Sequence, residues 1–337
     1  MGALEDAARA ASPTRCAAST RLYRDGRLVA SGFDVAEVSE HLADPACAVW
    51  LDLLQPDDAD MAVLVDELGL HPLAIEDALH AHQRPKLDRY RDHHFLAAYA
   101  VRLVGDEVEP AEVSAFITPR ALVTVRKDPA VPLEPVLARW DSSPTLARAG
   151  VPFLLHGLLD VLVDGYGEVV QDLEDRVEDL EDSLFDPASS DVDLQRRSFV
   201  LRSALSRLRR VALPVREVVA GIRRPDSGLA DDALAPYVRD VDDHVRRVLD
   251  GVEGLREQLD TVLQTTLALQ GQRLNQTLFR LSAYAAILAV TTAITGYYGQ
   301  NIPYPGIEDT SGFVASTVLL VVSVTALVVY FRRKGWL

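Results

Sequence analysis

The chain has 337 residues with a formal net charge of -16 at pH 7, and 25% of its residues are charged while 48% are hydrophobic. Such an excess of acidic groups would repel a phosphate backbone, so nucleic acid is not an expected partner. Cysteine occurs only at Cys16 and Cys47, which predicts neither a disulfide framework nor a thiolate metal site and fits a reducing cytosol.

The N-terminal region has a mixed α/β pattern. Residues 1–19 lack the apolar core of a signal peptide and are expected to be disordered, whereas residues 20–128 predict a cytoplasmic α/β domain. Tight turns at Asp25-Gly26 and Pro119-Arg120 predict two β-hairpins. The other elements predicted in this domain are strands at 48–54 and 93–103 and helices at 57–70 and 73–80.

Strand patterns end near residue 128, and a cytoplasmic helical region is predicted over 129–230. Two helices are expected within it, at 150–184 and 191–222. The first includes the acidic block 171–186, "QDLEDRVEDLEDSLFD". Because runs of charge usually lie on a solvated helix face, we interpret the block in that way rather than as a reservoir for cations.

A long helix is predicted over 231–298, since no proline follows Pro236 within that range. At 1.5 Å per residue it would be roughly 100 Å long. One side repeats apolar residues every 3.5 positions, as in a coiled coil, and we interpret this seam as a reason for several chains to assemble. The seam contains Val241, Val245, Val248, Val252, Leu255, Leu259, Val262, Thr266 and Leu269.

Two uncharged segments, 281–298 and 313–331, are near the roughly 20 residues that a helix needs to cross a bilayer. The connecting loop, 299–312, contains no Lys or Arg, whereas basic residues precede the first span and form the tail 332–337. The positive-inside rule therefore predicts a multi-pass protein of the plasma (inner) membrane with both termini in the cytoplasm.

A second stripe on the long helix is almost entirely small or polar. Small residues in a membrane helix permit close helix packing. Alternatively the stripe lines a pore, which would require several chains around an axis because two spans per chain cannot enclose water. The residues alone leave both possibilities open. The stripe contains Gln264, Ala268, Gly271, Asn275, Leu278, Ser282, Ala285, Ala289, Thr292, Gly296 and Gly299.

The turn "YGQN", Tyr298 to Asn301, follows the first predicted span. Gly296 and Gly299 would let the helix end and bring carbonyl groups close to an axis. A ring of Asn301 amide oxygens could accept hydrogen bonds from the water bound to a cation. Mg²⁺ loses its water reluctantly, so neutral acceptors would recognise the hydrated ion and still release it.

Three separated motifs give the chain, over about 20–337, a resemblance to the CorA family of divalent-cation channels. "YGQN" is similar to the Tyr-Gly-Met-Asn sequence of that family, "YFRRKGWL" resembles its basic C-terminal tail, and "LHPLAIEDALHAHQRPKLDRY" resembles one of its cytoplasmic segments. The resemblance implies a funnel-shaped homopentamer in the lipid membrane that conducts hydrated Mg²⁺ inward. No nucleophile–base pair or cofactor fingerprint indicates an enzyme.

The resemblance also implies roles for individual residues. An intracellular Mg²⁺ sensor between subunits would use Asp77, with Glu76 beside it, and Asp240. Carboxylates that meet across an interface repel one another unless a cation bridges them, so internal Mg²⁺ would favour the closed state. The pore residues implied are Tyr298, Gly299, Gln300, Asn301, Gly296, Thr292 and Asn275, with Leu278 and Leu281 as the hydrophobic gate.

The ion remains open at this point, because Gln300 replaces the methionine of the family motif. The alternative is a transporter of Zn²⁺, Co²⁺ or Ni²⁺ that resembles the ZntB branch. Histidines at 80, 82, 93 and 94 raise the possibility of a zinc site, but His93 and His94 would point to opposite faces of a strand. A third hypothesis is a membrane-anchored scaffold without conduction, in which the small-polar stripe only packs.

Overall fold

A computed structural model describes residues 16–80, 83–143, 145–186, 190–300 and 309–337. By its internal contacts the chain divides into two compact units, one ending at Asp260 and the other beginning at Thr261. The first contains the mixed α/β region and most of the long helices. The second contains the membrane-type helices.

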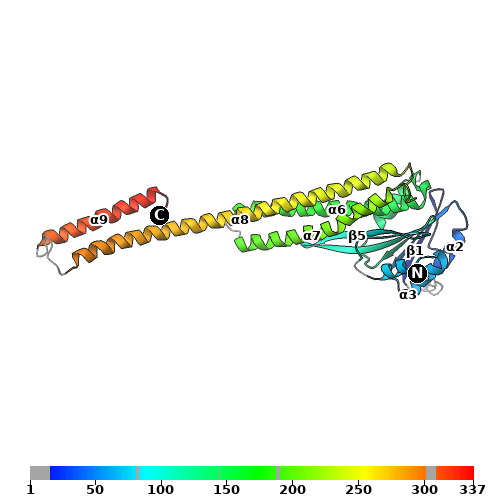
Figure 1. Ribbon diagram of the computed structural model, residues 1–337, viewed down its shortest axis with the longest axis horizontal. Helices are drawn as coiled ribbons and strands as arrows, with labels where there is room; N and C mark the ends of the chain where they lie inside the picture. The colour runs from blue at the N-terminus through cyan, green and yellow to red at the C-terminus, as the bar shows by residue number, and fades with distance from the viewer. Residues whose placement is uncertain (1–15, 81–82, 144, 187–189, 301–308) are drawn as a thin grey trace, which may run out of the picture. The chain divides into compact units, whose positions relative to one another are not determined.

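Within the described residues, seven strands form one sheet in the order β2-β1-β3-β7-β6-β5-β4, in which β3 and β7 are parallel and the other neighbours antiparallel (Figure 1). Both predicted hairpins are confirmed, and Asp25 and Gly26 take the positive φ angles of a tight turn. The strands are β1 (Ala17–Arg24), β2 (Arg27–Ser31), β3 (Cys47–Leu54), β4 (Lys86–Arg89), β5 (His94–Val104), β6 (Glu107–Ile117) and β7 (Ala121–Arg126).

Three parts of the sheet differ from the prediction. β1 begins at Ala17, so the end of the segment predicted to be disordered is a strand, while residues 1–15 lie outside the described part. β4 and the first half of β6 were not predicted. Pro110 interrupts the usual alternation in β6, but it lies opposite Val101 and the ladder continues past it. A proline lacks a backbone donor, which is why sequence patterns disfavour it within a strand.

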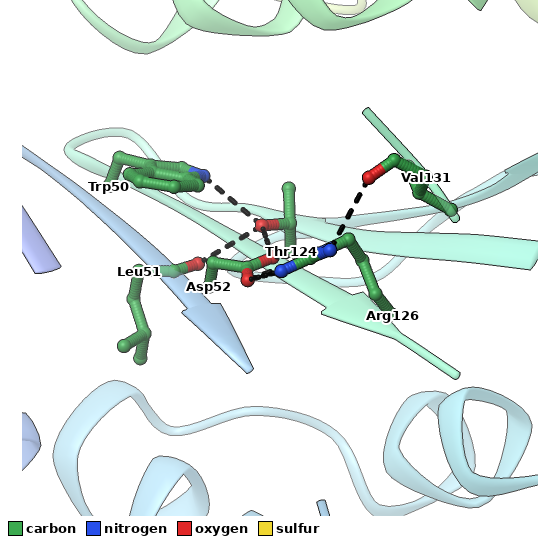
Figure 2. A network of polar contacts seen from close by, with 6 residues as sticks. All are labelled: Trp50, Leu51, Asp52, Thr124, Arg126 and Val131. Carbon is green, nitrogen blue, oxygen red and sulfur yellow. Dashed lines mark hydrogen bonds and ion pairs between the residues drawn. The ribbon is translucent and has the colours of Figure 1, made fainter. Parts of the chain in front are cut away.

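A buried polar network joins the parallel strands β3 and β7 (Figure 2). Arg126 donates to Asp52 at 2.7 Å, and the Thr124 hydroxyl donates to the same carboxylate at 2.7 Å. Trp50 donates to Thr124 at 3.1 Å, and Arg126 also donates to the carbonyl of Val131 at 3.3 Å. Because Asp52 is fully paired, its burial is tolerated, and the network fixes the pairing of the two strands and the path of the chain after β7.

The helices of the first unit cover the sheet. Helices α3 and α4 share a buried core with β3, β5, β6 and β7 that includes Met61, Leu64 and Ala74. Helix α6 contacts β5, and α7 contacts β6. The helix predicted at 191–222 is confirmed without change, whereas α5 was not predicted. The helices are α2 (Val38–His41), α3 (Asp58–Leu68), α4 (Pro72–Leu79), α5 (Glu134–Ser142), α6 (Val151–Asp182) and α7 (Asp191–Ile222).

The acidic block of α6 is a solvated face, as interpreted from the sequence. Leu173, Val177 and Leu180 are buried on the opposite side of the same turns. Their spacing of four and three residues gives the amphipathic pattern of a helix with one face against a core. The exposed carboxylates are Asp172, Glu174, Asp175, Glu178, Asp179 and Asp182.

The apolar seam of α8 (Ala235–Tyr298) is buried within the chain itself, which corrects its interpretation as an assembly contact. From Val241 to Leu259, each seam residue is at most 6% exposed. The part of α8 in the first unit runs beside α6 and α7 (Figure 1), and a Cβ atom at Gly251 would lie 3.0 Å from Val170 of α6. A 3.5-residue period fits packing within a chain as well as between chains. In this protein the seam packs within the chain.

The ends of the membrane-type helices also differ from the prediction. α8 begins at Ala235 rather than Asp231, because Pro236 is tolerated only in a first helical turn. α9 (Thr310–Arg333) begins three residues earlier than predicted and ends two residues later. Both helices contain a segment long and apolar enough to cross a membrane. α8 runs unbroken to Tyr298, as expected.

Candidate functional site

In the second unit, one side of α8 is shielded by the chain and the other is open. Ala283 is fully buried, and Ile287, Val290 and Ile294 are partly covered. At about 100° of rotation per residue these positions share one side of the helix. The small-polar stripe falls on the opposite side and is exposed throughout its membrane part. Its exposed positions there are Ser282, Ala285, Ala289, Thr292 and Gly296.

Aromatic stacking fixes the tail of α9 on α8. The rings of Phe279 and Trp336 stack with centroids 4.6 Å apart, and Trp336 stacks in turn on Phe331 at 5.5 Å. Phe331 is buried. The contact of the C-terminal tail with α8 therefore uses large side chains rather than the small-polar stripe. Within the described residues, packing inside one chain does not account for that stripe.

Gly296 and Gly299 lie at the C-terminal end of α8, where they allow the backbone a close approach. Gly299 continues the helical bonding by donating from its amide to the carbonyl of Thr295 at 2.9 Å, and a Cβ atom there would lie 3.0 Å from that carbonyl. A Cβ atom at Gly296 would meet open space. The Thr292 hydroxyl donates to Leu288 at 2.8 Å, which leaves its oxygen able to accept from water. Asn301 lies outside the described residues.

Asn275, Leu278 and Leu281 lie on the open side of α8, whereas Tyr298 is partly covered. Asn275 is exposed, and so are Leu278 and Leu281, at 51% and 65%. Tyr298 is the last residue of the helix and Gln300 follows its final turn. Exposed leucines among small and polar residues are what a hydrophobic constriction around an axis would require.

A positively charged side chain of the same chain, that of Lys86, lies beside the predicted sensor residue Asp77. Lys86 places its ammonium group 2.7 Å from Asp77 on α4 and 2.7 Å from Asp88 on β4. Burial alone would lower the pKa of Lys86, but its hydrogen bonds to Asp77 and Asp88 outweigh burial and raise the pKa above its ordinary value. Glu76 is exposed and adjoins this pair.

His80 and Gln83, which follow α4, are each held to the sheet by a polar contact. The Tyr99 hydroxyl donates to the carbonyl of Gln83 at 2.5 Å. Lys127 donates to the carbonyl of His80 and pairs with Glu112 at 3.0 Å. These contacts couple the position of α4, and with it Asp77, to the strands β5, β6 and β7.

Asp240, on the first turns of α8, is an exposed acid. Its carboxylate is 63% exposed and has His244 as a distant partner at 3.7 Å. By contrast, Asp242 is buried and accepts from both Arg223 and Arg246 at 2.8 Å. Asp242 is thus neutralised within the chain, whereas Asp240 is free to face a neighbour. Among the residues that the structure describes, Asp77 and Asp240 do not belong to one cluster of ligands within a single chain.

Beside Asp240 lies an acidic cluster that the sequence analysis missed. Asp160 and Asp164 of α6 and His244 of α8 have ligand atoms within 4.8 Å of one another. Arg139 of α5 contacts both carboxylates, at 3.1 Å for Asp164. The four-residue spacing of the two acids was a usable signal, but only the fold shows that α8 brings His244 to them.

The four histidines considered for zinc do not gather into a site within the described part of the chain, from which His82 is absent. His93 is buried just before β5 and stacks on Tyr90 with centroids 5.0 Å apart. His94 is the first residue of β5, and His80 contacts the Glu76 carbonyl at 2.8 Å. These are structural roles.

A soluble α/β unit joined to two C-terminal apolar helices defines an integral membrane protein with a large soluble domain. The family model described as "CorA-like Mg2+ transporter protein" matches residues 46–333. YfjQ of Bacillus subtilis, which bears the name of a metal ion transporter, is 30% identical over 85% of this chain and 89% of its own length. The cobalt/magnesium transport protein CorA of Thermotoga maritima is 28% identical over 87% and 85%.

The solved structure of the CorA magnesium transporter from Methanocaldococcus jannaschii matches with a TM-score of 0.73 and 24% identity, over 86% of this chain and 92% of that one. The zinc transport protein ZntB of Yersinia pestis is 24% identical over 88% and 89%. The chain belongs to the CorA-like transporter family. It is therefore a divalent metal-ion transporter of the membrane and not an enzyme, as the sequence predicted.

Proposed function

We propose that this protein is a passive Mg²⁺ influx channel of the plasma membrane, assembled as a homopentamer and gated by intracellular Mg²⁺. One observation carries the proposal: the small-polar side of α8 is open in the single chain and lies opposite the side that contacts the rest of the second unit. Several copies around an axis would turn this side toward water. Both termini would then lie in the cytoplasm, with lipid around the outer helix surfaces.

Conduction on this proposal needs no dehydration of the ion. A ring of Asn301 would accept from the water of hydrated Mg²⁺ at the outer end, and Asn275 would do so near the inner end. Between them Thr292 and Gly296 line the path, which narrows at rings of the apolar residues Leu278 and Leu281, the gate. An apolar ring closes by losing its water and opens when the ring widens.

Gating on this proposal uses charge across the subunit interface. Asp77, with Glu76, of one subunit would face Asp240 of the next. Bound Mg²⁺ would screen the repulsion between these carboxylates and hold the ring closed, and its loss would release them. The exposure of Asp240 and the neutralisation of its neighbour Asp242 support this assignment.

Flux into liposomes that contain the purified protein tests the function. We expect Mg²⁺ entry that follows an imposed membrane potential without ATP, and a large loss of entry for Asn301→Ala. Unchanged entry in that variant would remove Asn301 from the selectivity role. Absence of flux from the pure protein would favour the scaffold hypothesis, in which the small-polar stripe packs between chains.

The second candidate is transport of Zn²⁺ or another transition metal. The similarity to ZntB and the presence of Gln300 in place of methionine favour considering it. Competition among Mg²⁺, Co²⁺, Ni²⁺ and Zn²⁺ in the same liposomes separates the two candidates. Saturation by Zn²⁺ at concentrations where Mg²⁺ has no effect would decide for the second.

A further inference from the structure

A basic groove lies on the first unit, where α7, α8 and the segment after α4 meet. It has a volume of about 460 Å³. Four arginines from three separate segments of the sequence converge there, within a chain whose net charge is -16. The lining residues are Arg84, Ser206, Arg209, Arg210, Leu213, Pro214 and Arg256.

The acids near the groove do not neutralise these arginines fully. Glu217 lies 3.6 Å from Arg84, and Glu253 lies 3.1 Å from Arg256 and 3.9 Å from Arg209. Two carboxylates therefore face four guanidinium groups. Because like charges held together destabilise one another, the excess positive charge favours an anion.

Two arginine side chains in the groove indicate the chemical class of that anion. Arg210 has no ion-pair partner among the described residues, and the Nε atom of Arg256 is buried there without a hydrogen-bond acceptor. A buried donor without an acceptor is destabilising, so Arg256 would gain from a shift of its side chain that brings this atom to a ligand oxygen in the groove. Guanidinium groups match the paired oxygens of a phosphate group, and several of them match a chain of phosphates.

We propose that this groove binds a small molecule of the triphosphate class. Its phosphates pair with Arg210 and Arg256. Arg84 and Arg209 would exchange their long contacts with Glu217 and Glu253 for contacts to the same phosphates. The volume lies within the roughly 300–1,000 Å³ of typical small-ligand pockets. Leu213 and Pro214 supply an apolar wall that would accept the base of a nucleotide.

Isothermal titration of the full-length protein in detergent tests the proposal, with ATP and inorganic triphosphate as the two probes. The buffer is phosphate-free, low in salt and contains EDTA, so that removal of bound Mg²⁺ by the probe cannot produce the signal. We expect saturable binding that weakens as salt rises. Tighter binding of ATP would identify a nucleotide site, and equal binding would identify recognition of the phosphates alone.

The double variant Arg210→Gln/Arg256→Gln is expected to bind about tenfold more weakly or worse, since two charge-assisted contacts are lost. Arg196→Gln is the matched control, because Arg196 is an exposed arginine of the same helix whose partner is Asp193. An unchanged melting temperature shows that each variant folds. Absence of saturable binding to the wild type overturns the proposal. Equal binding of the probes by the wild type and the double variant overturns it as well.

Discussion

At the scale of single residues, Lys86 is the side chain that most directly opposes a cation at Asp77. Its ammonium group already neutralises that carboxylate at 2.7 Å, and both side chains are partly exposed, at 30% and 27%. A divalent ion at Asp77 must therefore displace or share this contact. On the proposed gating, Lys86 sets how much Mg²⁺ is needed to close the channel.

Lys86→Gln is expected to lower the Mg²⁺ concentration that half-protects the protein from protease. A partly exposed ion pair is worth up to about 1 kcal/mol, so the shift should reach up to about fivefold. Asp240→Lys should change protection in the opposite direction and weaken it. Arg102→Gln, which breaks an exposed pair with Glu109, is the control and should change nothing. A Lys86 variant that needs the same Mg²⁺ as the wild type would contradict this role.

His93 gives a prediction for pH. Burial lowers its pKa, with a further lowering by His71, and its Nε2 atom has no partner within the described residues. As pH falls through about 6.5, the unfolded chain takes up a proton at this residue before the folded chain does, so stability is lost. His93→Phe should therefore reduce the fall in melting temperature between pH 7.5 and pH 5.5. Parallel pH profiles for variant and wild type would contradict this effect.

At the scale of elements, the packing of α5 on α6 depends on a glycine. A Cβ atom at Gly157 would lie 2.5 Å from the Nε1 atom of Trp140, which is buried and donates to the carbonyl of Leu154 at 3.0 Å. Trp140 also packs edge-on against Trp50 of β3 with centroids 5.2 Å apart. One small residue thus lets α5, α6 and the sheet share an aromatic core.

Gly157→Ala should lower the free energy of unfolding by about 1–3 kcal/mol, because the added methyl group overfills a close-packed site. Gly167→Ala on the same helix is the matched control, since a Cβ atom there meets nothing within 4 Å. That change should instead stabilise the helix by about 0.5–1 kcal/mol. Thermal unfolding of the intact protein measures both, and an equal effect of the two substitutions would disprove the packing argument.

The elements also show how far a sequence pattern reaches. The helix at 191–222 and the hairpin at Asp25-Gly26 follow from local signals, namely amphipathic period and turn chemistry, and both are confirmed. The partner of the α8 seam was predicted wrongly, because a period states that a face is buried and not what buries it. The same limit hid the approach of His244 to Asp160 and Asp164, which depends on how α6 and α8 pack.

For the molecule as a whole, local features of the sequence were sufficient to define its class. The apolar segments and the three motifs, at 70–90, around Tyr298 and at 330–337, predicted a CorA-like transporter, and the family match over 46–333 confirms it. The ion and the subunit count could not be predicted in this way. On the proposed function, both depend on how several copies place Asn301 and the open side of α8 around a common axis.

The central claim is that the small-polar side of α8 faces water in the assembled protein. The accessibility of single cysteines measures this directly. In a background with Cys16→Ser and Cys47→Ala, single cysteines would replace Ser282, Thr292 and Gly296 on the open side, and Val290 and Ile294 on the covered side. A charged methanethiosulfonate reagent is then applied while Mg²⁺ enters liposomes. We predict that the reagent blocks flux only for cysteines on the open side; equal block on both sides, or block only on the covered side, would contradict the account.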